Sequence, residues 1–359
     1  MKYKKLGKSN LLVSPICLGT WEFAQTGAWG SIDIDECKRI VDYALDAGIN
    51  FIDTAEGYGK SEEILGKLLK GRREGIVLAT KIGPPKWDYE TMRKRLEGSL
   101  SRLQTGYIDL YIIHWPKIKG HWGTNQTDME DKDYEDISNS LKNLIAEGLV
   151  TTGGVSNFRL HHLTKFRDDA FEYIVVDQVP YSLLFRSYDE EDIANFCKSK
   201  SLKYLSYSSL AQGLLTGKYT RDSALTDIQH MNVLFNEPIY SRAMKVVDVL
   251  KQVAMEVDAT PAQVALKWVI ERDLIASALV GVKRVSELEE NVKALDIHLT
   301  TEQMERLDKA SLEFWAPLSR RQGLELWLHD SVKSDLEAIG IREENLSGKA
   351  LASFRGART

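Results

Sequence analysis

Short apolar runs alternate with amphipathic stretches along most of the chain. Apolar runs of strand length begin near residues 16, 49, 76, 108, 151, 173, 202 and 275. Between them, apolar residues recur three and four positions apart. Cys37, Ile40, Val41 and Ala44, for example, give one buried face to a helix expected over residues 35–47. The pattern therefore predicts eight strand–helix units in succession.

Eight such units predict an α/β protein, a (β/α)8 TIM barrel with a closed parallel sheet. An open doubly wound sheet is less favoured, because no Gly-x-Gly-x-x-Gly motif follows the first strand. Residues 2–13 are expected to form an N-terminal hairpin with its turn at 7–10. We expect the barrel to span residues 1–312 and a C-terminal extension, residues 313–359, to pack on the barrel or on a partner subunit.

Composition narrows the class of protein. The chain has 359 residues, 43% of them hydrophobic and 28% charged, which is typical of a globular protein. A net charge of −5 argues against a nucleic-acid or anionic-membrane surface. No apolar run of transmembrane length and no signal-peptide pattern occurs, and three scattered cysteines fit a reducing compartment. We therefore expect a cytoplasmic protein without a metal centre.

Polar residues end several of the apolar runs. Asp53, Lys81, His114 and Gln178 each stand at the end of an expected strand, and Tyr58 follows Asp53 in a short loop. In a parallel barrel the carboxyl ends of the strands meet at one face, and active sites form there. We therefore expect these side chains to lie together.

Their chemistry suits proton donation to a carbonyl oxygen. A tyrosine has a reference pKa near 10, and a nearby ammonium group lowers it. A buried lysine needs a counter-ion, which Asp53 can supply. We expect Tyr58 to donate the proton, Lys81 to tune it and His114 to orient the substrate oxygen. The hydride must then come from a cofactor.

At these residues the sequence resembles the aldo-keto reductase superfamily. The catalytic pattern of that family falls on Asp53, Tyr58, Lys81 and His114, and the resemblance runs from about residue 4 to residue 312. Four further stretches also look like the family: 98–103 (GSLSRL), 107–111 (YIDLY), 154–158 (GVSNF) and 213–219 (GLLTGKY). The resemblance implies reduction of an aldehyde or ketone, sugar-derived carbonyls included, by a nicotinamide cofactor.

The resemblance also implies a set of cofactor contacts along the barrel mouth. They are Gly19, Thr20, Trp21, Asp53, Ser156, Asn157, Gln178, Tyr181, Ser208, Leu210, Gln212, Gly213, Lys218, Gly281, Lys283, Arg284, Glu290 and Asn291. Tyr181 would stack on the nicotinamide, and Lys283 with Arg284 would favour NADPH over NADH. Glu287 stands where the family often has glutamine, which acts against that preference.

Substrate contacts are expected from Trp21, Tyr58, Trp87, His114 and Trp115. The polar segment 117–133 follows the strand of His114 and is expected to be an active-site loop. The helix after the last strand should open with a capping box at residues 286–289.

Other functions remain open at this point. Potassium-channel β subunits share the expected fold and the 213–218 phrase, so a cofactor-sensing regulatory subunit is the main alternative. A barrel isomerase or lyase is a weaker one. The expected partner is a small carbonyl substrate, and the extension offers a surface for a second copy of this chain. Neither a nucleic acid nor a membrane is expected as a partner.

Overall fold

The computed structural model describes residues 1–26, 32–119, 127–318 and 333–355. Eight parallel strands close into a barrel, as the sequence predicted, and β10 pairs with β3 to complete it. The strands, in barrel order, are β3 (Ile16–Gly19), β4 (Phe51–Asp53), β5 (Val77–Ile82), β6 (Ile108–Ile113), β7 (Val150–Ser156), β8 (Ile174–Pro180), β9 (Lys203–Tyr207) and β10 (Ile275–Gly281).

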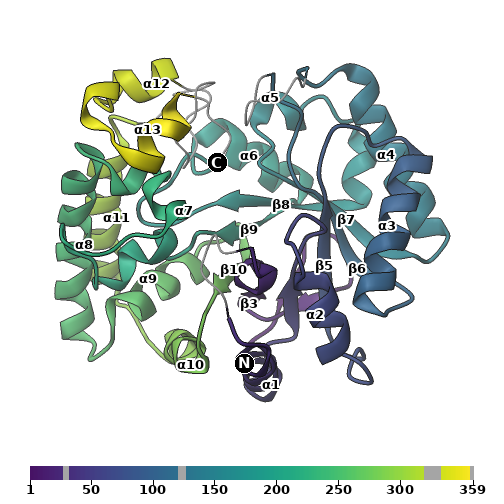
Figure 1. Ribbon diagram of the computed structural model, residues 1–359, viewed down its shortest axis with the longest axis horizontal. Helices are drawn as coiled ribbons and strands as arrows, with labels where there is room; N and C mark the ends of the chain where they lie inside the picture. The colour runs from purple at the N-terminus through teal and green to yellow at the C-terminus, as the bar shows by residue number, and fades with distance from the viewer. Residues whose placement is uncertain (27–31, 120–126, 319–332, 356–359) are drawn as a thin grey trace.

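Helices surround the barrel (Figure 1). The α-helices are α1 (Ile34–Asp46), α2 (Ser61–Leu68), α3 (Tyr89–Leu103), α4 (Asp131–Ala146), α5 (Leu160–Leu163), α6 (Glu191–Lys200), α7 (Asp227–His230), α8 (Ile239–Glu256), α9 (Pro261–Ile270), α10 (Val285–Val292), α11 (Thr301–Trp315), α12 (Lys333–Ala338) and α13 (Gly348–Phe354). Short 3-10 turns are η1 (Trp21–Ala24), η3 (Asp168–Glu172), η4 (Ala211–Thr216), η5 (Val233–Phe235), η6 (Lys293–Leu295) and η8 (Glu343–Asn345).

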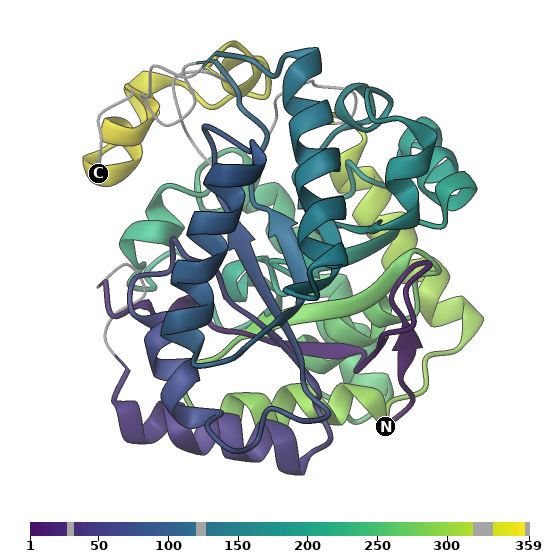
Figure 2. The ribbon, with the colours of Figure 1, turned by 90° about the vertical axis from the view of Figure 1, so that its right-hand side faces the viewer.

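An antiparallel hairpin precedes the barrel, as predicted. Its strands are β1 (Lys4–Lys5) and β2 (Leu12–Val13), and Leu6 and Val13 are fully buried in the cluster that fills the barrel interior. The hairpin therefore closes one end of the barrel. In Figure 2 it lies at the opposite end of the molecule from the yellow C-terminal extension.

Strand alternation decides which side chains point into the barrel. Phe51, Val77, Ala79, Leu110 and Ile112 belong to the interior cluster, whereas their neighbours pack against the helices. Successive strand residues face opposite sides. The same alternation places residue 53 of β4, residue 81 of β5 and residue 114, directly after β6, on the interior side. All three are polar residues that the sequence singled out.

The C-terminal extension contains α12, η8 and α13. Leu336, Ile341 and Phe354 are buried, and Lys349 Nζ lies 3.4 Å from the carboxylate of Asp227 on α7. Figure 1 shows α13 beside α7. The middle of the expected loop 117–133, residues 120–126, lies outside the described residues. Within the described ranges, no helix is long and apolar enough to cross a membrane.

Candidate active site

The centre of the site is a buried ion pair beside a tyrosine. Lys81 Nζ donates to Asp53 Oδ1 at 2.5 Å and to the carbonyl oxygen of Thr54 at 2.8 Å, and it lies 3.3 Å from the hydroxyl of Tyr58. Lys81 is fully buried and Asp53 is 2% exposed. An ammonium group so placed can hold the phenol oxygen while its proton leaves.

The electrostatics keep Lys81 charged and Tyr58 protonated. Burial acts to lower the pKa of Lys81, but Asp53 and Tyr58 raise it above its ordinary value. Burial raises the pKa of Tyr58, and Lys81 only partly opposes that shift. The expected net lowering of the Tyr58 pKa is therefore wrong in sign, because desolvation exceeds the effect of the ammonium. A protonated phenol is nevertheless the form that a general acid needs.

His114 is neutral at this site. Burial lowers its pKa well below the ordinary value, and the positive charge of Lys81 adds to the effect. Its ring meets the Tyr58 ring edge-on with centroids 5.6 Å apart, and both residues line the same cavity. A neutral imidazole can donate one hydrogen bond to a substrate oxygen next to the Tyr58 hydroxyl.

The neutral state of His114 predicts a pH dependence of stability. Below about pH 6.5 the unfolded chain binds a proton on this histidine that the folded chain does not. The free energy of unfolding should therefore fall with decreasing pH, by up to about 1.4 kcal/mol per pH unit from this residue. Urea unfolding between pH 5 and 6.5 measures it. His114→Gln should reduce that slope, and an unchanged slope would show that His114 titrates normally in the folded protein.

Amides and hydroxyls at or beside the ends of β7, β8 and β9 form a connected group next to the ion pair. Gln178 Nε2 donates to Asp53 Oδ2 at 2.9 Å, and Ser156 Oγ donates to the backbone oxygen of Gln178 at 2.8 Å. Asn157 Nδ2 lies 3.0 Å from Ser156 Oγ, and the hydroxyl of Tyr207 donates to Asn157 Oδ1 at 2.8 Å. These groups fix the geometry of a surface that can bind a planar carboxamide.

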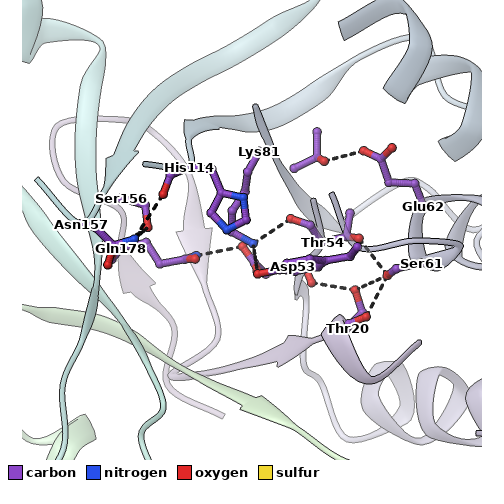
Figure 3. A network of polar contacts seen from close by, with 12 residues as sticks. Thr20, Asp53, Thr54, Ser61, Glu62, Lys81, His114, Ser156, Asn157 and Gln178 are labelled. Atoms are coloured by element: carbon purple, nitrogen blue, oxygen red, sulfur yellow. Dashed lines mark hydrogen bonds and ion pairs between the residues drawn. The ribbon is translucent and has the colours of Figure 1, made fainter. Parts of the chain in front are cut away.

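Buried hydroxyls support the other side of Asp53 (Figure 3). Ser61 Oγ lies 2.9 Å from Thr54 Oγ1 and donates to the backbone oxygen of Thr20 at 2.9 Å. Thr20 Oγ1 donates to the backbone oxygen of Asp53 at 2.9 Å. The network connects the ends of β3 and β4 to the start of α2. It therefore restrains the residues on which the ion pair depends.

Many of these groups line one cavity of about 1150 Å³. Its lining includes Tyr58, His114 and Trp115 and also residues of α10 and of the β10–α10 connection. The expected cofactor contacts that line it are Gly19, Thr20, Trp21, Asp53, Ser156, Asn157, Gln178, Ser208, Leu210, Gln212, Gly213, Lys218, Gly281, Lys283, Glu290 and Asn291.

Three expected contacts do not line this cavity. Tyr181 is 1% exposed, stacks on Trp268 and hydrogen-bonds Asp189, so its predicted stacking on the nicotinamide is contradicted. Trp87 is 1% exposed in the helix-side core, so it is not a substrate contact. Arg284 lines a separate, smaller surface cavity beside α1.

Sequence reasoning missed other lining residues. Tyr207 ends β9 on an interior position, since Leu205 two residues earlier belongs to the interior cluster, and the strand-end rule could have found it. Glu22 directly follows the expected contact Trp21 but carried no signal of its own. The segment 223–231, which includes α7, also contributes to the lining, and so does Ser353 of the extension.

The residues fit a dinucleotide. Both side-chain polar atoms of Gln212 are buried without a hydrogen-bond partner and line the cavity. The next residue, Gly213, has a φ of 94°, which other residues rarely adopt. A turn in this conformation, with side-chain polar atoms that lack a hydrogen-bond partner, suits a phosphate-bearing ligand. Within the described ranges, no group of three or more His, Cys, Asp or Glu side chains could hold a metal ion.

Comparison with curated proteins finds relatives along most of the chain. Aldo-keto reductase YhdN of Bacillus subtilis is 30% identical over 346 residues, covering 90% of this chain and all of the relative. The NADH-specific methylglyoxal reductase of Escherichia coli is 30% identical over 326 residues, covering 84% of this chain and 95% of the relative. A probable voltage-gated potassium channel subunit beta of Arabidopsis thaliana is 29% identical over 317 residues, covering 83% of this chain and 92% of the relative.

Solved structures agree with this grouping. The glycerol dehydrogenase AKR11B4 from Gluconobacter oxydans superposes with a TM-score of 0.74 at 27% identity, covering 87% of this chain and 95% of that one. Residues 15–312 match the Aldo/keto reductase family as a whole. With the closed barrel and the cavity at its mouth, these matches show that the chain belongs to the aldo/keto reductase family of oxidoreductases.

Proposed function

We propose that this protein reduces an aldehyde or ketone, sugar-derived carbonyls included, to the corresponding alcohol, with Tyr58 as the general acid. The observation that carries the proposal is the Tyr58 hydroxyl, 3.3 Å from the fully buried ammonium of Lys81 and facing the cavity. Such an arrangement stabilises negative charge that develops on a carbonyl oxygen during reduction.

The bound cofactor would be a nicotinamide dinucleotide, which supplies the hydride. Ser156, Asn157 and Gln178 would hold its carboxamide, and the turn at Gln212 and Gly213 would hold its phosphates. Of the two residues behind the expected preference for NADPH, Lys283 lines this cavity, and Arg284 lines an adjoining one that Lys283 also lines.

The substrate oxygen would lie between Tyr58 and His114. The neutral His114 orients that oxygen by donating a hydrogen bond, and Tyr58 transfers its proton as the oxygen becomes negative. Trp21 and Trp115 line the cavity at the same end, and Trp21 stacks on the Tyr58 ring with centroids 5.8 Å apart. They would provide the apolar surface on which the substrate rests.

The alternative is a regulatory subunit that binds the cofactor with little turnover, and the similarity to the Arabidopsis channel subunit is the observation in its favour. A panel of aldehydes, ketones and sugars, assayed by oxidation of NADH and NADPH at 340 nm, separates the two functions. Turnover on at least one class of carbonyl is expected. Tight cofactor binding without turnover on any member of the panel would favour the regulatory subunit.

The role of the extension remains a prediction. Its α13 lies beside α7, and Ser353 lines the cavity, which supports a part in shaping the site. A homo-oligomer contact through the outer surface of the extension is the other role expected from sequence. The division into a barrel, residues 1–312, and an extension, residues 313–359, also remains a prediction from the sequence.

A further inference from the structure

Among the described residues, three carboxylates line the cavity besides Asp53. They belong to Glu22, Glu287 and Glu290, and the sequence singled out only the last two. We propose that Glu287, supported by Glu22, makes this chain select NADH over NADPH. The inference rests on the proposed function, and it reverses the cofactor preference expected from Lys283 and Arg284.

The lining of the cavity offers a place for the adenosine ribose. On the proposed function, the reacting carbon of the nicotinamide lies beside Tyr58, and the rest of an extended dinucleotide occupies other parts of the same cavity. The lining includes residues between 281 and 291, where β10 leads into α10. In this arrangement the adenosine ribose, with its 2′ position, lies beside Lys283 and Glu287.

Glu287 lines the cavity and hydrogen-bonds the backbone of the β10–α10 connection. The backbone N–H of Lys283 donates to Glu287 Oε2 at 2.7 Å, and the backbone N–H of Val285 donates to Glu36 Oε1 at 2.8 Å. The expected capping box at 286–289 is absent, because α10 begins at Val285 with Arg284 as its N-cap and without a side-chain cap. Free N–H groups at a helix start attract phosphate. Here the N–H groups of Lys283 and Val285 already donate to carboxylates of this chain, those of Glu287 and Glu36.

Glu22 adds a second carboxylate in the same region. It packs directly on Gly281, where any added Cβ would lie only 2.1 Å from a carboxylate oxygen. The absence of a side chain at Gly281 is what makes room for Glu22. Burial raises the pKa of Glu22 to about 7; the charge of Lys283 opposes that shift and the charge of Glu287 adds to it. Additional negative charge is therefore unfavourable here.

The positive charges in this part of the cavity do not outnumber the acids. Lys283 and Lys218 line it, and Lys218 Nζ lies 3.6 Å from Glu290 Oε2. Arg284 lines the adjoining cavity with Glu36 and Arg39, and Lys283 lines both cavities. The carboxylates of Glu287 and Glu290, and the partly protonated Glu22, thus share this cavity with two ammonium groups. No arginine is among the described residues that line it.

The two cofactors differ at one point of that ribose. NADH carries a 2′-hydroxyl, which can donate a hydrogen bond to a carboxylate, as in other dinucleotide sites where an acidic residue reads the ribose. NADPH carries a 2′-phosphate with a charge near −2, which the same carboxylate repels. The Glu287 carboxylate therefore favours binding of NADH and disfavours binding of NADPH.

The test is a direct binding measurement on the full-length protein. NADH and NADPH are titrated separately by calorimetry into the wild type, Glu287→Gln and Glu289→Gln. Glutamine keeps an oxygen that can accept from the Lys283 N–H, so the connection can stay formed. Glu289→Gln makes the same change of charge two residues away on an exposed position of α10, outside the cavity lining. It is the matched control.

We expect the wild type to bind NADH more tightly than NADPH. Glu287→Gln should shift the ratio of the two dissociation constants towards NADPH by about tenfold, the size expected for removing one charge a few ångströms from another. Glu289→Gln should leave the ratio unchanged. Added salt should narrow the preference of the wild type, because it screens the repulsion.

Tighter binding of NADPH by the wild type would overturn the inference, and so would a ratio that Glu287→Gln does not move. Either result leaves the proposed reduction intact. Failure to bind both cofactors would instead overturn the proposed function itself.

Discussion

Tyr58→Phe should lower carbonyl turnover by about 10²–10⁴-fold, the usual contribution of a general acid. The substitution removes the hydroxyl that lies 3.3 Å from the Lys81 ammonium, on a residue that lines the cavity, and it keeps the ring that stacks on Trp21. Cofactor binding should change little, because none of the amides opposite Tyr58 is touched. Steady-state kinetics and calorimetric titration of the cofactor measure the two effects separately.

Tyr207→Phe is the matched control for that variant. It removes a phenol from the same cavity, but this hydroxyl donates to Asn157 Oδ1 instead of facing Lys81. The loss of one such hydrogen bond should weaken cofactor binding or turnover by no more than about tenfold. Equal losses of turnover in the two variants would show that Tyr58 has no special role as the acid.

Lys81→Met should damage both stability and catalysis. Without its partner, Asp53 is an unpaired carboxylate that is 2% exposed, and breaking a buried pair in this way costs about 3–5 kcal/mol. Turnover should also fall by about 10²–10³-fold, since the group that stabilises charge at the Tyr58 oxygen is lost. Urea unfolding and steady-state kinetics give the two numbers.

The double variant Asp53→Asn, Lys81→Met separates the two effects. Replacing the carboxylate by an amide removes the unpaired charge, so much of the lost stability should return. Turnover should stay low, because the ammonium beside Tyr58 is still missing. A double variant that is as unstable as Lys81→Met, or as active as the wild type, would contradict this account of the ion pair.

Strand periodicity explains how much of the site could be predicted from sequence. Asp53, Lys81 and His114 continue the interior positions of their strands, so the run endings alone were enough to bring them together. The same rule exposes the error at Tyr181. Val176 is interior, which makes 178 interior and 181 exterior, and Tyr181 accordingly packs on Trp268.

Contacts between distant segments could not be predicted in this way. Glu36 on α1 accepts a hydrogen bond from the backbone N–H of Val285, 249 positions away, at the start of α10, where the sequence predicted a local capping box instead. Trp87 lies in a connection whose path depends on α4, where Ser140 Oγ donates to the Trp87 backbone oxygen at 2.8 Å. Neither partner is signalled by the local pattern of apolar and polar residues.

Hydride transfer to a carbonyl carbon is the central claim, and isotopic labelling tests it most directly. The protein is incubated with a carbonyl from the substrate panel and with the preferred cofactor carrying deuterium at the pro-R position of C4, and the alcohol is analysed by mass spectrometry and NMR. The account predicts one deuterium on the carbinol carbon of the product. An alcohol without deuterium, or a converted substrate with no oxidation of the cofactor, would contradict it.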